Sequence, residues 1–401
     1  MPVPSSPAPS RLVFLDWLRI LAFALLVLYH VGMYYVSWNW HVKSPHAGAA
    51  LEPWMLLSSP WRMDLLFLVS GAATSFMLVR SGATVSLLGK RARRLLLPLL
   101  FGMLVVVPPQ SWLEVAHKLG YGGSYPEFMA LYLGGFGGFC FAPGRCLVLP
   151  TWNHLWFLPY LFAYTALLWA VVRAWPGLVD RLAARLPVWA AGAGLLLWPL
   201  LFLVSTRLLL RARFPDTRAL VDDWFAHSQY LAMFLLGVQL ARAPAVWMRF
   251  AQWRWPALGL ALVAWVLLLR SAGDAPMAGS VSPMLRWALV SVQQWCAIVA
   301  ALGFARLHLN HDGPLRRYLT EAVFPVYILH QTAIIVLAQW LRPWQLGVAP
   351  EAAVLVGATV LVCFAGFEAV RRVGWLRPWM GLEPRRGAAP ARPVPGARQL
   401  P

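Results

Sequence analysis

The stretch LVFLDWLRILAFALLVLYHVGMYYV, residues 12–36, decides how this chain folds. It is apolar or aromatic apart from Asp16, Arg19 and His30, and the core of a bilayer takes about 20 such residues as one α-helix. The composition agrees, since 60% of the 401 residues are hydrophobic and only 12% are charged. A soluble protein carries about 25% charged residues. The sequence therefore predicts an integral-membrane protein and excludes a soluble enzyme, a secreted disulfide scaffold and a disordered chain.

Further apolar stretches predict an all-α polytopic membrane protein with about ten transmembrane helices and no separate soluble domain. We expect an N-terminal segment at 1–11, an integral-membrane domain at 12–371 and a Pro/Arg-rich tail without regular structure at 372–401. The first helix is expected to be retained, because no cleavable signal-peptide pattern precedes it. The predicted spans are Leu12–Val36, Trp54–Val79, Leu95–Leu113, Asn153–Val172, Pro187–Thr206, Trp224–Ala241, Trp255–Leu269, Pro283–Ala305, Leu319–Leu341 and Ala352–Val370.

Basic residues predict the orientation. The two termini and the even-numbered loops hold 22 Lys and Arg, against 10 in the odd-numbered loops. The positive-inside rule therefore puts both termini in the cytoplasm. The same rule accounts for the net charge of +19 without nucleic acid as a partner. The fifth loop is the exception, because Arg207, Arg211, Arg213 and Arg218 fall on the predicted outer side.

The four cysteines show no spacing typical of a metal site. Cys296 and Cys363 lie in apolar segments, where a buried thiol acts as a small hydrophobic residue. Cys140 and Cys146 lie in a Gly-rich loop on the predicted outer side. In an oxidising compartment these two could form a disulfide, and the sequence leaves this open.

Ionisable residues inside the first span are candidates for function, because charges in a membrane usually face a protein interior or a watery cavity. Arg19 and His30 are eleven positions apart, so both lie on one helical stripe about 16 Å apart along the axis. Asp16 is three residues before Arg19 and near enough to pair with it. A purely structural, hydrogen-bonding role for His30 is the alternative.

Four other stretches supply candidate site residues. Ser70 and Gly71 are small residues at the middle of the second span, and close helix packing is the simpler interpretation of their presence there. Arg91 and Arg94 belong to a basic cluster that suits either membrane anchoring or a phosphate-rich ligand. His154 and Trp156 open the fourth span, and an interfacial Trp is expected there in any case. Tyr327 and His330 share one face of the ninth span, which gives a second intramembrane histidine for proton transfer.

These residues resemble those of a known family. The segment LDWLRILAFALLVLYH, with its Arg19 and His30, resembles the signature of the type 3 acyltransferases, integral-membrane enzymes that O-acylate extracytoplasmic carbohydrates. Further blocks match in the same order: FLVSG at 67–71, RARRLLLP at 91–98, HLWFL at 154–158 and VYILHQT at 326–332. The segment WNWHVKS at 38–44 looks most like the branch called glucans biosynthesis protein C, which transfers succinyl groups to periplasmic glucans.

The resemblance implies a location in a bacterial inner membrane and a role for each candidate. Acyl-CoA, carrying succinyl or acetyl, would be the co-substrate, with no bound cofactor or metal, and a periplasmic or cell-surface glycan would accept the acyl group. His30 would be the general base or the nucleophile, with Asp16 and Arg19 shaping the donor path. The donor would be bound by Arg91, Arg94 and Ser70. The acceptor side would hold His41, His154, Trp156, Tyr327 and His330.

A proton-coupled transporter or flippase of glycan or lipid intermediates is the alternative function. Buried His and Asp residues in about ten spans suit a carrier as well. Release of free CoA thiol from acyl-CoA separates the two, since only the acyltransferase produces it.

Overall fold

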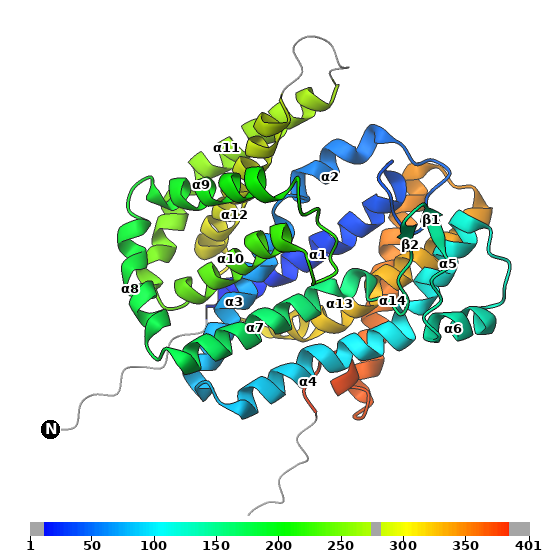
Figure 1. The fold of residues 1–401 in the computed structure, drawn as a ribbon, viewed down its shortest axis with the longest axis horizontal. Coiled ribbons are helices and arrows are strands. Elements are labelled where there is room, and N and C mark those ends of the chain that lie inside the picture. Colours follow the sequence, from blue (N-terminus) through cyan, green and yellow to red (C-terminus); the bar gives the residue numbers. More distant parts are fainter. Residues whose placement is uncertain (1–11, 274–281, 385–401) are drawn as a thin grey trace, which may run out of the picture.

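The computed structural model describes residues 12–273 and 282–384, and these form a bundle of α-helices (Figure 1). The one sheet in this part of the chain is a two-stranded antiparallel hairpin of β1 (Cys140–Ala142) and β2 (Arg145–Cys146). The prediction of an all-α polytopic protein without a separate soluble domain is therefore confirmed. The N-terminal segment 1–11 lies outside the described residues.

Seven helical stretches in the described residues are long and apolar enough to cross a bilayer, and two bent helix pairs raise that number to nine. Each of the ten predicted spans overlaps a helix of the structure. Nine of them correspond to these nine stretches, and the sixth corresponds to α10, which has only 17 residues. The helices are α1 (Val13–Tyr35), α2 (Glu52–Ser58), α3 (Arg62–Ser81), α4 (Val85–Phe101), α5 (Pro108–Leu119), α6 (Tyr125–Leu133), α7 (Phe157–Ala174), α8 (Leu178–Trp189), α9 (Gly194–Leu210), α10 (Trp224–Leu240), α11 (Trp247–Gly273), α12 (Pro283–His308), α13 (Pro314–Leu341) and α14 (Val348–Arg372).

Two predicted spans have wrong boundaries because the chain bends inside or beside them. The third begins earlier, at Val85, and turns by 43° after a π-helical segment at Gly102–Val106, where α5 starts with two prolines. Proline has no backbone N–H to continue the helix, so the chain breaks there. The fifth predicted span starts too early, since Pro187 belongs to α8, which lies at 112° to α9.

Two glycines let α3 and α10 approach until their backbones touch. A Cβ atom on Gly71 would lie 1.9 Å from the carbonyl oxygen of Phe234, and one on Gly237 would lie 1.9 Å from that of Leu68. Only glycine fits such a contact, so the close-packing interpretation of Gly71 is confirmed. This contact sets the start of α3 beside the chain that leads into α10.

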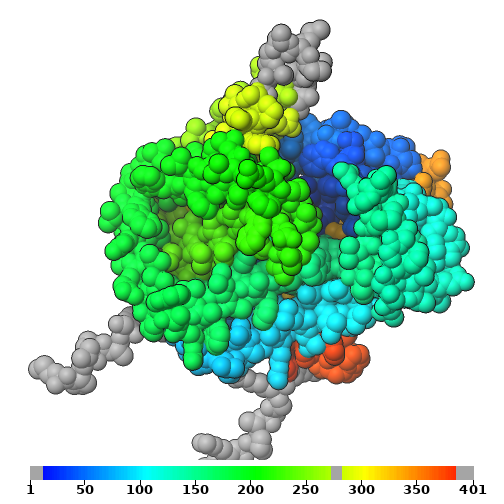
Figure 2. Space-filling model, in the orientation of Figure 1, coloured from blue at the N-terminus to red at the C-terminus, as the bar shows by residue number. Residues whose placement is uncertain are grey.

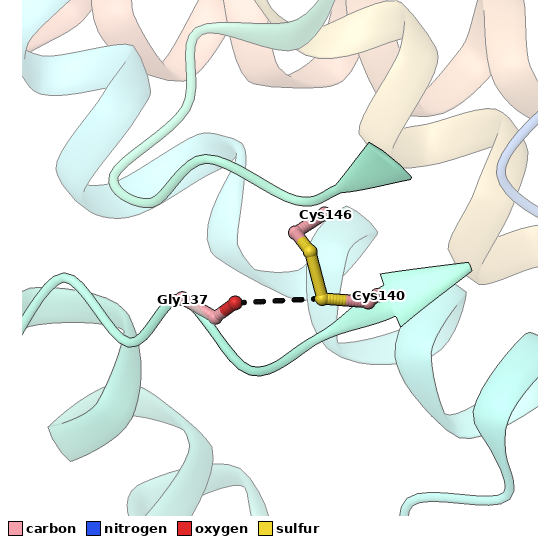
Figure 3. The surroundings of a disulfide bond; sticks show 3 residues. All are labelled: Gly137, Cys140 and Cys146. Carbon is pink, nitrogen blue, oxygen red and sulfur yellow. Dashed lines mark hydrogen bonds between the residues drawn. A yellow bond between two sulfur atoms is a disulfide. The ribbon is translucent and has the colours of Figure 1, made fainter. Parts of the chain in front are cut away.

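The loop after α5 folds into a small lobe. Phe128, Tyr132 and Phe139 form an apolar cluster with Val115 and Leu149. A disulfide joins Cys140 to Cys146, the pair that the sequence left open, and the Sγ atom of Cys140 lies 3.6 Å from the carbonyl oxygen of Gly137 (Figure 3). In the space-filling view this lobe is teal, and a hollow separates it from the green segments (Figure 2).

The chain after α14 is folded over residues 373–384, where the sequence predicted an unstructured tail. A short 3₁₀ helix, Pro378–Met380, packs against α4 and α13. Met380 and Leu382 are buried there, and Arg377 bonds to Glu321 at 3.1 Å. The prediction is wrong for this part, because buried apolar residues follow the last helix. The remaining tail lies outside the described residues.

Candidate active site

A cavity of about 370 Å³ brings together most of the residues singled out at the predicted outer face. Its walls come from α1, the α1–α2 loop, α3, the segment just before α7, the loop before α10, and α13. His30, His41, His154, Trp156 and Tyr327 all line it, so one space holds His30 and most of the predicted acceptor side. The predicted His330 lies directly behind His30. The sequence reasoning missed the lining residues Trp40, Arg62, Asn153, Arg218 and Gln331.

His30 and His330 form a hydrogen-bonded pair. His30 Nδ1 lies 2.8 Å from His330 Nε2, and His330 Nδ1 lies 2.7 Å from the carbonyl oxygen of Tyr327. A carbonyl oxygen only accepts, so His330 Nδ1 carries the hydrogen and its Nε2 is the acceptor. His30 Nδ1 must then be the donor in this pair. The lone pair of His30 therefore lies on Nε2, on a ring that lines the cavity.

His154 is held in one tautomer by the same kind of contact. Its Nε2 lies 3.0 Å from the carbonyl oxygen of Ile328, so this nitrogen donates. Its Nδ1 faces the side-chain amide of Gln110 at 3.4 Å. Tyr327 fixes the backbone here by donating to the carbonyl oxygen of His154 at 2.7 Å. The imidazole of His154 is thus held next to His330, with ring centroids 5.1 Å apart.

A chain of polar side chains leads from Glu114 into this site. His41 Nδ1 contacts the Glu114 carboxylate, and His41 Nε2 lies 2.9 Å from Gln331 Nε2. Gln331 also donates to Gln110 Oε1 at 2.9 Å. Lys118 bonds to Glu114 at 2.6 Å. The acid and the two amides come from α5 and α13, and neither the basic clusters nor the helical stripes in the sequence pointed to them.

Aromatic rings form much of the remaining wall. The Trp40 ring lies nearly parallel to the imidazole of His30, with an interplanar angle of 14° and centroids 6.5 Å apart. Trp156 is buried, and its ring centroid lies 5.4 Å from that of Tyr230 and 5.4 Å from that of Tyr160. The general expectation of an interfacial Trp therefore does not describe Trp156, which belongs to the core.

The other end of α1 carries an ion-pair network. Asp16 lies 3.9 Å from Arg19, as predicted, but it also contacts Arg316 of α13. Arg316 is 2% exposed and pairs with Asp312 as well, at 2.9 Å. Its hydrogen bond lowers the pKa of Asp312 to about 2, so the Asp312 carboxylate is charged at neutral pH. This network ties α1 to α13, the two helices that carry the histidine pair.

The predicted donor residues lie on α4 and α3. Arg91 is half-buried and lies within electrostatic range of both Arg94 and Arg19. Arg94 is more exposed, and its guanidinium lies 3.9 Å from the Glu383 carboxylate. The structure thus brings three arginines together at this end of the bundle. Ser70 is half-buried on α3 and lines neither the histidine cavity nor the small cavity beside Arg91.

No group of three or more His, Cys, Asp or Glu side chains in the described residues could hold a metal ion. The arrangement is instead suited to moving a proton. An imidazole of fixed tautomer presents an unprotonated nitrogen to a cavity that is large enough for part of a substrate and is lined by polar and aromatic groups.

Comparison with known proteins agrees with this chemistry. A family model described as an acyltransferase domain matches residues 12–368, almost the whole described chain. No curated protein and no solved structure shows significant similarity to the chain.

Proposed function

Because the chain belongs to the type 3 acyltransferase family, we propose that it moves an acyl group, succinyl or acetyl, from cytoplasmic acyl-CoA to a hydroxyl of an extracytoplasmic glycan such as a periplasmic glucan. Family membership favours this O-acyltransferase over a transporter. The observation that carries the proposal is the histidine pair, in which His330 leaves His30 Nε2 as the proton acceptor at the cavity wall.

In the simplest reaction, His30 acts as general base. The hydroxyl oxygen of the glycan attacks the thioester carbonyl carbon while His30 Nε2 takes the hydroxyl proton. The carbon–sulfur bond breaks, the new ester carbon–oxygen bond remains, and the CoA thiolate receives the proton from His30. The imidazolium formed in between keeps its Nδ1–H bond to His330, which stabilises the charge.

His30 could equally act as a nucleophile. Its Nε2 would attack the thioester carbonyl carbon and expel the CoA thiolate, which gives an acyl-imidazolium with Nδ1–H still bonded to His330. The glycan hydroxyl oxygen would then attack the acyl carbon and free Nε2, and the hydroxyl proton would neutralise the CoA thiolate. Both routes need the same tautomer of His30. They differ in whether an acyl-enzyme accumulates when the acceptor is withheld.

The donor is proposed to enter from the cytoplasmic face. Arg91 and Arg94, with Arg19 near them, offer guanidinium groups that suit the phosphates of CoA. Arg19 lies about 16 Å from His30 along α1, and this distance would be spanned by the slender pantetheine arm. Asp16 contacts Arg316, which keeps this end of α1 fixed beside α13.

The acceptor is proposed to enter from the opposite face. His41, His154, Trp156 and Tyr327 line the cavity with imidazole, indole and phenol groups that suit a sugar. The Cys140–Cys146 disulfide supports an oxidising compartment on this side, and thus the predicted cytoplasmic location of both termini in a bacterial inner membrane.

A reconstituted transfer assay tests the proposal. Proteoliposomes receive succinyl-CoA or acetyl-CoA and a glucan oligosaccharide, free thiol is measured with time, and the glycan is analysed by mass spectrometry. We expect thiol release that depends on the glycan, with a matching mass increment on it. Glycan movement across the membrane without thiol release would overturn the acyltransferase and support the carrier.

A further inference from the structure

A second cavity, of about 180 Å³, lies beside the histidine cavity. The two share walls formed by Tyr29, Arg62, Trp156 and Arg218. A group bound in the second cavity would therefore be a short distance from the reacting atoms at His30.

Four arginines line this second cavity: Arg62 at the start of α3, Arg207 near the end of α9, and Arg211 and Arg218 in the following loop. The last three belong to the fifth loop as predicted from the sequence, which is the exception to the positive-inside rule. The fourth arginine of that loop, Arg213, does not line the cavity. The exception to the rule is thus explained if these arginines serve a ligand on the outer side and have no part in setting the orientation.

Arg62 is the clearest sign of a ligand. It is 6% exposed, and its Nε and Nη1 have no hydrogen-bond partner in the part of the chain that the structure describes. Its guanidinium lies 3.2 Å from the centroid of the Tyr29 ring, a cation–π contact that orients the group. A buried guanidinium with unused donors costs free energy, and this cost is removed when an anion accepts from it.

The acidic groups of the cavity do not balance the arginines. Two carboxyls, Asp64 and Asp216, face the four guanidinium groups, and the other titratable groups there are the phenols of Tyr29 and Tyr230. Asp216 lies 3.9 Å from Arg218 and offsets one of the four guanidinium charges, and burial raises the pKa of Asp216.

The remaining arginines have neutral partners. Arg207 donates to Ser291 at 3.0 Å and to Gln294 at 2.6 Å. Arg211 stacks over Phe225 at 5.2 Å. Among the described residues, neither of them forms an ion pair within 4 Å, and Arg62 forms none. The cavity therefore has a positive excess that is available to a ligand.

We infer that this arginine cavity binds a carboxylate carried by a substrate during the proposed transfer. The carboxylate could come from the far end of a dicarboxylic acyl group such as succinyl, or from an acidic sugar of the acceptor. In either case the inference rests on the proposed function, and it adds that one substrate is an anion at this end. Arginine suits the ligand because its planar donors bind both oxygens of a carboxylate.

The kinetic test compares Arg218→Gln and Arg62→Met with the control Arg213→Gln, which removes a charge from the same loop outside the cavity. The donors are succinyl-CoA and butyryl-CoA, which have the same number of acyl carbons and differ in the terminal carboxylate. The acceptors are a neutral glucose oligosaccharide and one that contains glucuronic acid. Arg62→Lys, which keeps the charge, should retain more of the preference than Arg62→Met.

If the carboxylate is on the donor, the ratio of kcat/KM for succinyl-CoA over butyryl-CoA falls roughly ten- to hundredfold in both cavity variants, as expected for loss of charged hydrogen bonds. If it is on the acceptor, the same fall appears in the ratio of acidic over neutral oligosaccharide. The inference is overturned if both ratios change no more in the two cavity variants than they do in Arg213→Gln.

A binding measurement separates this inference from the transfer activity. Thermal stabilisation of the purified protein by succinate and by glucuronate is compared with that by the uncharged analogues butyramide and glucose. We expect one carboxylate probe to stabilise the wild type beyond its uncharged analogue, and this gain to be lost in Arg62→Met and Arg218→Gln but kept in Arg213→Gln. A gain that persists in the cavity variants, or is absent from the wild type, counts against the site even where transfer is observed.

Discussion

His30 and His330 are 300 residues apart in the chain, yet His30 Nδ1 lies 2.8 Å from His330 Nε2. The carbonyl of Tyr327 fixes the hydrogen of His330 on its other nitrogen. The pair therefore determines which nitrogen of His30 takes up the proton, and this relationship underlies the first two predictions.

Replacing His30 by alanine removes the proton acceptor at the cavity. We expect His30→Ala to lower the rate of glycan acylation about 10²- to 10⁴-fold, as for other positioned acid–base groups. The measurement is kcat in proteoliposomes, with protein amount and size-exclusion profile matched to the wild type. Near-normal turnover in a well-folded variant would remove His30 from the mechanism.

His330 is expected to act through His30 as a positioning residue. His330→Leu should lower kcat roughly fivefold, because one hydrogen bond of about 1 kcal/mol is lost, while KM for acyl-CoA stays the same. His330→Gln offers an acceptor near the same position and should restore part of the rate. Equal kcat in the leucine and glutamine variants would show that His330 serves packing alone.

The arginines of α4 distinguish ligand binding from anchoring. The double variant Arg91→Lys with Arg94→Lys keeps both charges, so insertion and protein level should not change. Lysine lacks the planar donor pair of arginine, so we expect a raised KM for acyl-CoA and an unaltered KM for the glycan. Steady-state kinetics with each substrate varied in turn measures this, and an unchanged KM for acyl-CoA would favour anchoring.

The orientation can be measured with reporter fusions. Fusions after Arg94 and after Arg386 should report cytoplasm, and one within Gly120–Phe136 should report periplasm, because the basic residues are concentrated on the former side. A cytoplasmic signal from the Gly-rich segment would reverse the orientation and, with it, the proposed direction of acyl transfer.

The Cys140–Cys146 disulfide should contribute to stability. The double variant Cys140→Ser with Cys146→Ser should unfold at a lower temperature in detergent, since closing so short a loop is worth about 2 kcal/mol in the chain-entropy account. A reducing agent should lower the unfolding temperature of the wild type and leave that of the double variant unaltered. Identical melting of the two oxidised proteins would contradict this.

The local pattern of the sequence was enough to predict the helices and the polar residues that α1 contributes to the site. Apolar runs long enough for a bilayer predicted every span, although the bends at Gly102–Val106 and between α8 and α9 moved two boundaries. The stripe of Asp16, Arg19 and His30 on one helix followed from helical spacing, and the 3.9 Å contact of Asp16 with Arg19 agrees with it.

Only the tertiary structure decided which residues meet across helices. Helical spacing gives the face on which a side chain lies but not the helix that packs on that face, because packing depends on contacts such as Gly71 against Phe234. His330 as the partner of His30 and Arg316 as the partner of Asp16 depend on how α13 lies along α1. In the same way, the sequence shows the loop arginines only as an exception to the positive-inside rule. They line one cavity together with Arg62 because α3 and α10 pack against each other.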